Sequence, residues 1–196
     1  MIGLPVADRF CKPLGDKKAL RTKLGWPQEK TIILLVGGGE GMGPLGEIAK
    51  EINRANLDAG LVVVTGRNKK LKEEMESMEW KFPAKIYGFV TDMPDFMRSA
   101  DILVTKAGPG TICEALIANL PIILYHRIPG QEEGNVSYVV DEGAGFFSLN
   151  TQDIIFTLTE WLEKPDKRNI AVKNAKRMAK PEAARKIARK ISALIE

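Results

Sequence analysis

Short runs of apolar, largely β-branched residues alternate along this chain with longer stretches in which apolar residues recur at helical spacing. The runs are continuous rather than interleaved with polar residues, which is typical of strands buried on both faces of a parallel sheet. This alternation predicts the α/β class, with a Rossmann-like parallel sheet and helices on both faces. The predicted strands span residues 31–36, 61–65, 84–88, 101–105, 121–125 and 145–148, and the predicted helices span 44–56, 69–78, 92–99, 110–118 and 136–142.

The pattern divides the chain into three regions. Residues 1–30 contain scattered prolines and glycines and no predicted strand or helix, so we expect an extended lead-in or linker. Residues 31–163 form the Rossmann-like domain. Residues 164–196 form basic C-terminal helices, interrupted at Pro165 and Pro181.

Charge is concentrated in the third region. Residues 164–190 carry eleven Lys and Arg against two acidic residues, whereas the whole chain has a net charge of +4. Such a surface suits anionic lipid head groups or nucleic acid. A solvated helix face explains the same charge run equally well.

The composition excludes several classes of protein. No apolar run approaches the roughly 18 residues of a membrane span, and the first residues lack a signal-peptide pattern. Two cysteines and one histidine make neither a disulfide framework nor a metal-ligand cluster, so we expect no metal site. We therefore expect a cytoplasmic protein in a reducing compartment.

Ligands of a Rossmann-like sheet bind beyond the carboxyl ends of its strands, and here the first such end is glycine-rich. Residues 37–43 read GGGEGMG, which permits close backbone approach to a phosphate at a helix start. A formal GxGxxG also occurs, with glycines at 41, 43 and 46. No acidic residue ends the second strand to bind a ribose, which disfavours NAD binding. Arg67 follows that strand, so NADP binding stays possible. A purely structural tight turn is the alternative.

Two further loops carry polar side chains. Residues 106–111 read KAGPGT, and Glu114 follows one helical turn later, where its carboxylate could accept hydrogen bonds from a ribose diol. Residues 129–135 read PGQEEGN and offer donors and acceptors suited to sugar hydroxyls. Taken alone, Glu114 could equally be a solvated helix residue, and 129–135 a solvated polar loop.

Several ordered motifs together resemble a known family. The stretches LLVGGGEGMGP, VVVTGRNKKL, GFVTDM, TKAGPGTICEAL and PIILYHRIPGQEEGNVSYVV are similar to the C-terminal domain of monogalactosyldiacylglycerol synthases, in glycosyltransferase family 28. The similarity covers about residues 2–163. It implies the C-terminal half of a GT-B fold, in which residues 31–163 bind a nucleotide-sugar.

The resemblance also implies roles for particular residues. The diphosphate would face Gly38, Gly39, Gly41 and Gly43 and be held by Lys106, Gly108, Gly110 and Thr111. Uracil would meet the main chain of Phe89 and Val90, the ribose would meet Glu114, and the hexose would meet Gln131 and Glu132 beside Asn135. Arg67 and Asn68 match the family's GRN turn.

The reaction implied is inverting transfer of a hexose, galactose in preference to glucose, from a UDP-sugar to diacylglycerol. The UDP-sugar is a substrate, and no cofactor and no nucleic acid is expected. The acceptor site and general base of the family lie in an N-terminal half, so we assign no catalytic residue and expect diacylglycerol to bind through that half or a partner chain. We also expect a peripheral membrane location through an anionic lipid surface.

Four alternatives stay open. The chain could be the donor-binding subunit of a split glycosyltransferase, part of a UDP-glucose-dependent diacylglycerol glucosyltransferase, or a non-catalytic nucleotide-sugar-binding module. A dinucleotide-dependent Rossmann enzyme is the fourth, supported by the formal glycine match alone.

Overall fold

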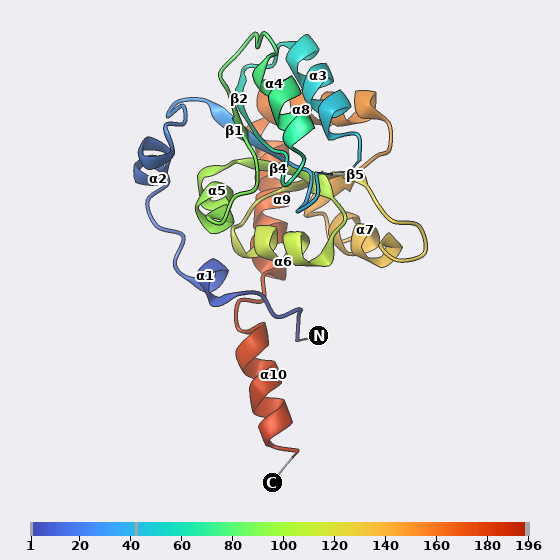
Figure 1. Ribbon diagram of the computed structural model, residues 1–196. Helices are drawn as coiled ribbons and strands as arrows, with labels where there is room; N and C mark the ends of the chain where they lie inside the picture. Colours follow the sequence, from blue (N-terminus) through green and yellow to red (C-terminus); the bar gives the residue numbers. More distant parts are fainter. Residues whose placement is uncertain (1, 42, 195–196) are drawn as a thin grey trace.

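The computed structural model describes residues 2–41 and 43–194 and contains a six-stranded, entirely parallel sheet (Figure 1). The strand order is β3-β2-β1-β4-β5-β6. This confirms the predicted fold class. The strands are β1 (Thr31–Val36), β2 (Ala59–Val64), β3 (Ala84–Tyr87), β4 (Ile102–Lys106), β5 (Ile122–His126) and β6 (Gly145–Phe147). Met1, Met42 and residues 195–196, which fall in the expected lead-in, glycine-rich loop and C-terminal helices, lie outside the described residues.

Helices connect the strands at the predicted places. They are α1 (Asp8–Cys11), α2 (Lys17–Leu24), α3 (Leu45–Ala55), α4 (Lys69–Glu76), α5 (Met93–Ser99), α6 (Pro109–Ile117), α7 (Glu133–Val140), α8 (Thr151–Glu163), α9 (Pro165–Met178) and α10 (Ala183–Ser192). Most boundaries differ from the prediction by one or two residues, and two of the shifts change the picture. Helix α7 begins three residues earlier than expected, which places Asn135 inside it, and β2 begins at Ala59 because the small residues Ala59 and Gly60 pair with β1.

The sheet has an apolar core on each face, as continuous apolar strands require. Ile33 and Leu35 pack on one side against α3, α4 and α8. Leu34 and Val36 pack on the other side against α5, α6 and α7. The helix α9 contributes buried residues to both cores.

The first thirty residues are not an extended linker throughout, because they form α1 and α2 and pack on the domain. Phe10 and Trp26 are buried, and the Trp26 ring meets Phe96 at a centroid distance of 5.0 Å. The buried Arg21 guanidinium donates to Asp101 at 2.5 Å and to the Ser99 carbonyl at 2.9 Å. The sequence pattern missed this contribution because the segment contacts the core through a few separated side chains rather than a periodic face.

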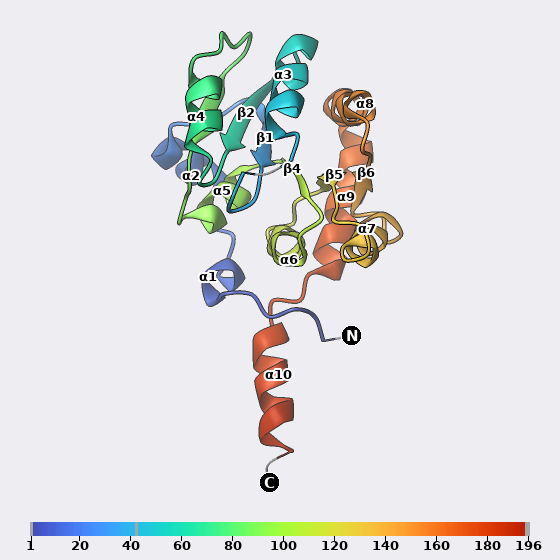
Figure 2. The ribbon, with the colours of Figure 1, turned by 45° about the vertical axis from the view of Figure 1, so that its right-hand side comes forward.

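The C-terminal helix α10 projects away from the body of the domain (Figures 1 and 2). Its only described buried residue is Ala183, at its first position. Ile191 and Leu194 are exposed, and basic residues flank them along the helix. An amphipathic helix of this kind leaves its apolar stripe available to another surface.

Candidate functional site

A small cavity lies beside the point where the strand order reverses. The chain runs from β1 outward to β2 and β3 and then crosses back to β4, so the loops after β1 and β4 diverge there and leave a crevice. The cavity has a volume of about 130 Å³, and we call it the switch-point cavity. Its lining residues are Val36, Gly38, Gly39, Val64, Gly66, Phe89, Val90, Met93, Met97, Thr111 and Glu114.

Six of the predicted site residues line this cavity, and they come from three separate loops or helix starts. Gly38 and Gly39 follow β1, Phe89 and Val90 follow β3, and Thr111 and Glu114 lie on α6. The sequence reasoning did not assign the apolar floor, which includes Met93 and Met97. The signal was present, because the predicted helix at 92–99 carries an apolar face.

The glycine-rich loop is shaped by close backbone contact with the loop after β2. Gly41 has φ of +61°, and a Cβ there would stand 2.0 Å from the Thr65 carbonyl oxygen. Gly66 has φ of +62°, and its Cβ would stand 2.4 Å from the Gly39 oxygen. Only glycine fits both demands without strain. Gly43 lies farther along, where a Cβ would meet the Tyr125 ring at 3.5 Å.

Asn68 acts as scaffolding for the same two loops. Its side-chain amide donates to the Gly41 carbonyl at 3.3 Å, and its amide oxygen accepts from the Leu71 backbone N–H at 3.0 Å. The second bond caps the start of α4. Both polar atoms of Asn68 therefore hold protein backbone, outside the switch-point cavity.

Arg67 contacts side chains from two loops at the rim of the cavity. Its guanidinium pairs with the Glu40 carboxylate at 2.5 Å and lies 4.8 Å from the centroid of the Phe89 ring. The Phe89 side chain is 56% exposed, so the ring stands at the cavity mouth. A cation stacked on an exposed ring at such a mouth offers a flat platform to a planar ligand.

Glu114 is the acidic group of the cavity. Burial raises its pKa to about 7, against the lowering effect of the nearby Arg9 guanidinium. Arg9 belongs to the lead-in and also donates to the Thr91 carbonyl at 2.9 Å. A half-buried carboxylate with no hydrogen-bond partner among the described residues can accept hydrogen bonds from two hydroxyl groups of a ligand.

The start of α6 supplies the positive end of the site. Gly108 is the residue before the helix, no side chain caps it, and a Cβ at Gly108 or Gly110 would meet no atom within 4 Å. The space beside both glycines is therefore open, and the helix dipole favours an anion near this end of α6. The Lys106 side chain lies across Gly38, since a Cβ at Gly38 would stand 2.9 Å from Lys106 Cε.

The loop after β5 is held in place by two of its predicted sugar-binding residues. Glu132 is buried, and its carboxylate accepts from the Ile128 backbone N–H at 2.8 Å. The Asn135 amide donates to the Ala107 carbonyl at 2.9 Å and so ties this loop to the one after β4. Gln131 is exposed. All three lie outside the switch-point cavity, in the loop after β5 and the first turn of α7.

Two further observations concern the described part of the chain. Residues 2–41 and 43–194 contain no group of three or more His, Cys, Asp or Glu side chains arranged to hold a metal ion. None of their helices is both long enough and apolar enough to cross a membrane.

Solved glycosyltransferases share this fold. MurG from Acinetobacter baumannii superimposes with a TM-score of 0.70 at 18% identity, over 97% of this chain and 57% of that one. Anabaena HepE, solved with UDP and glucose, superimposes with a TM-score of 0.66 at 17% identity, over 95% of this chain and 55% of that one. At such identities the likeness shows the fold alone.

Curated relatives are much more similar in sequence. Monogalactosyldiacylglycerol synthase 1, chloroplastic, of Arabidopsis thaliana is 43% identical over 98% of this chain and 38% of its own length. The spinach synthase is 41% identical over the same shares. The chain thus spans less than half the length of these relatives.

The family model for the glycosyltransferase family 28 C-terminal domain matches residues 32–191. This match covers all of the sheet except Thr31, the switch-point cavity and most of α10. The resemblance seen in the sequence motifs is therefore confirmed: the chain belongs to glycosyltransferase family 28 and comprises its C-terminal domain.

Proposed function

We propose that this chain is the donor-binding domain of an inverting glycosyltransferase that transfers galactose from UDP-galactose to diacylglycerol. The observation that carries the proposal is the pairing of Glu114 with the uncapped start of α6 at the switch point. A carboxylate for a ribose diol and a helix start for a diphosphate are the two features a nucleoside diphosphate requires. The names of the 43%-identical relatives supply the sugar and the acceptor.

The residues divide the donor between them. Uracil would stack near Phe89 and meet the main chain at Val90, and the ribose hydroxyls would donate to Glu114. The diphosphate would lie between the glycine-rich loop and α6, close to Lys106. The hexose would then extend toward the exposed Gln131, while Glu132 and Asn135 keep that loop in position.

The same groups would assist the chemistry. An acceptor hydroxyl oxygen, deprotonated by a base, attacks the anomeric carbon while the bond to the diphosphate oxygen breaks, and configuration at that carbon inverts. Negative charge grows on the departing diphosphate, and the α6 N–H groups and Lys106 ammonium would stabilise it. We place the base and the acceptor-binding half in the part of the relatives that this chain does not match, on the same polypeptide or a partner chain.

Helix α10 is the part of the chain that we propose to contact a membrane. Arg185, Lys186, Arg189 and Lys190 flank the exposed apolar residues of this projecting helix. Each basic side chain near an anionic bilayer contributes about 1 kcal/mol of attraction. We propose that the protein is peripheral to an anionic membrane in a reducing compartment, where it meets its lipid acceptor.

Calorimetric titration with UDP-galactose, UDP-glucose, NAD and NADP tests the donor assignment. We expect UDP-galactose to bind, the dinucleotides to give no heat, and Glu114→Ala to weaken the UDP-sugar. Tighter binding of UDP-glucose than of UDP-galactose would indicate a glucosyltransferase instead. Binding of a dinucleotide in place of both UDP-sugars would refute the proposed donor-binding function.

Vesicle flotation tests the membrane assignment. Lys186→Glu with Arg189→Glu should abolish binding to vesicles containing anionic phosphatidylglycerol, whereas Lys69→Glu with Lys85→Glu, exposed elsewhere on the domain, should not. If the α10 pair binds vesicles as well as the unchanged protein does, α10 is not the lipid contact.

A further inference from the structure

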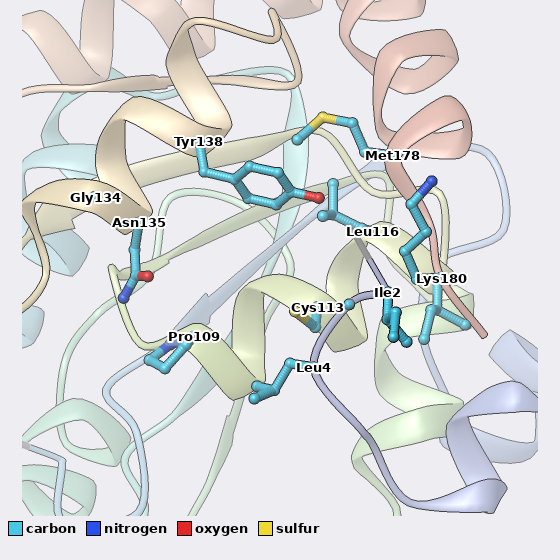
Figure 3. Close-up of a pocket in the computed structure, with 12 residues that line it drawn as sticks. Ile2, Leu4, Pro109, Cys113, Leu116, Gly134, Asn135, Tyr138, Met178 and Lys180 are labelled. Atoms are coloured by element: carbon cyan, nitrogen blue, oxygen red, sulfur yellow. The ribbon is translucent and has the colours of Figure 1, made fainter. Parts of the chain in front are cut away.

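An apolar groove lies between α6 and α7 (Figure 3). Its lining residues on α6 differ from Thr111 and Glu114, which line the switch-point cavity. Its volume is about 590 Å³. Cys113 and Leu116 line it from α6, Tyr138 from α7, Met178 from the end of α9, and Leu4 from the lead-in. We call this feature the α6–α7 groove.

The groove begins where the candidate donor site ends. Pro109 and Gly134, at the first turns of α6 and α7, line one end of it. Pro109 directly follows Gly108 at the proposed diphosphate position, and Gly134 lies three residues after Gln131 at the proposed hexose position. Thr111 and Glu114 leave the same helix on its other side and face the switch-point cavity. A ligand in the groove would therefore have one end beside the transferred sugar.

Charge is placed at the opposite end. Among the described residues that line the groove, Lys180 is the only charged one, and Figure 3 shows it with Met178 at the far side from Pro109. The end beside the donor site is thus apolar or neutral. This arrangement suits an uncharged lipid whose chain enters the groove and whose neutral head stays at the helix starts.

We propose that the α6–α7 groove holds one acyl chain of the diacylglycerol acceptor. The inference rests on the proposed function for the acceptor's identity, and it assigns this domain a share in acceptor binding besides donor binding. A cavity of this size lies in the range of pockets that enclose small organic ligands. With the chain in the groove, the free glycerol hydroxyl would lie near the starts of α6 and α7, where the anomeric carbon of the hexose is placed.

The two cysteines provide an internal reporter and its control. Cys113 lines the groove, whereas Cys11 lies on α1 outside it, and both are partly accessible. We would label the protein with N-ethylmaleimide and follow each cysteine by peptide mass spectrometry. Burial raises the pKa of the Cys113 thiol, so labelling is measured at constant, mildly alkaline pH.

Dioctanoylglycerol at ten times its dissociation constant should slow Cys113 labelling about 10-fold, since only the unoccupied fraction reacts. Cys11 labelling should stay the same, and glycerol, which is the head without chains, should protect neither cysteine. Unchanged Cys113 labelling would overturn the proposal. Equal protection by dioctanoylphosphatidylcholine would also overturn it, because the groove would then bind lipid chains without regard to the acceptor head.

A matched pair of variants locates the protection. Gly134 lines the groove, and a Cβ there would meet no atom within 4 Å, so Gly134→Ala adds one methyl group in open space while Gly134→Trp adds a large ring beside the groove. The Trp variant should lose the protection and the Ala variant should keep it. Protection that persists in the Trp variant would place the lipid elsewhere and overturn the proposal.

UDP-galactose titration of the same samples separates this proposal from the proposed function. Donor binding without Cys113 protection would remove the acyl groove and leave the donor site intact. Protection of Cys113 by dioctanoylglycerol without donor binding would keep the groove as a diacylglycerol site and remove the donor assignment.

Discussion

Replacing Glu114 with glutamine keeps the shape of the side chain and removes its charge, so it isolates what this carboxylate does in the switch-point cavity. Burial raises the pKa of Glu114 to about 7 from its ordinary value of 4.5. A ribose diol that donates two hydrogen bonds favours the ionised form. Donor binding should therefore tighten as the pH rises through 7.

The structure sets the size of this effect. With a pKa of about 7, roughly one-tenth of Glu114 is ionised at pH 6 and roughly nine-tenths at pH 8, so an ionised-only site binds about 10-fold more tightly at pH 8. Hydrogen bonds to a charged group contribute about 1.5–3 kcal/mol. Glu114→Gln should thus weaken binding at pH 8 by about 10- to 100-fold and flatten the pH dependence.

The free energy of unfolding should fall as the pH rises, whereas donor affinity should increase. Because the folded pKa lies above the ordinary value, the folded state holds the proton between pH 4.5 and about 7, and the free energy of unfolding falls as pH rises through that window. The full difference corresponds to at most ~3 kcal/mol. The carboxylate is partly exposed, and solvent screening reduces this to about 1 kcal/mol. Glu114→Gln should therefore be more stable than the unchanged protein at pH 8.

The assay combines calorimetry with urea unfolding at pH 6, 7 and 8. UDP-galactose is used in place of UDP, whose terminal phosphate titrates near pH 6. Glu163→Gln, at the exposed end of α8, is the matched control and should change neither affinity nor stability. Equal affinities of the unchanged protein and Glu114→Gln at pH 8, or the same pH dependence in both, would refute the reasoning.

Three further predictions follow from the same geometry. Gly41→Ala should destabilise the protein by about 1–3 kcal/mol in urea unfolding, because the residue has a positive φ and its Cβ would stand 2.0 Å from the Thr65 oxygen, whereas Gly108→Ala should leave stability nearly unchanged. Lys106→Met should weaken the binding free energy of UDP-galactose by about 1.5–3 kcal/mol in calorimetry, because the variant lacks the ammonium proposed to contact the diphosphate. The free energy of unfolding should change little, since the Lys106 side chain lies over Gly38 at the site. Asp101→Asn should lower the free energy of unfolding by about 2–4 kcal/mol at pH 7, because it leaves a buried guanidinium without its anion.

Each of these has a control and a contrary result. Equal stability of the Gly41 and Gly108 variants would show that the loop relaxes freely. Lys173→Met, on the exposed face of α9, controls for loss of charge, and an equal loss of affinity in that variant would show that Lys106 does not contact the ligand.

For Asp101 the control is the pH dependence of stability. Burial alone would raise the pKa of Asp101, but Lys17, the Ile32 N–H and Arg21 lower it below 3.8. Its stabilisation is therefore complete above that pH and lost as pH falls through the lowered value, and the Asn variant should lack this acid-sensitive part.

Local signals in the sequence were enough for the fold class and for the glycine-rich loops. The apolar runs at β1, β4 and β5 are continuous because both faces of the sheet are covered, and this pattern can be read without knowing which strands pair. Glycine at Gly41 and Gly66 likewise marks a backbone demand at its own position. Both kinds of signal are confined to a few neighbouring residues, so sequence reasoning detects them.

The directions of particular side chains could not be read in the same way. Glu132 was expected to meet the hexose, which stays a prediction, and the pattern gave no sign that this side chain is buried with its carboxylate accepting from the Ile128 N–H. Arg9 was placed in an extended linker, and it lies close enough to Glu114 to influence its pKa. Both outcomes depend on contacts between residues on different turns or elements, which a one-dimensional pattern does not contain.

The sequence by itself therefore determined the Rossmann-like alternation, the three polar loops and the family to which the chain belongs. Only the tertiary structure decided that the loop after β1 and the start of α6 flank one cavity, and that α6 and α7 enclose an apolar groove with the lead-in. The physical reason is that strand order and helix packing join residues far apart in the chain. Those contacts depend on the summed complementarity of whole surfaces rather than on any local spacing.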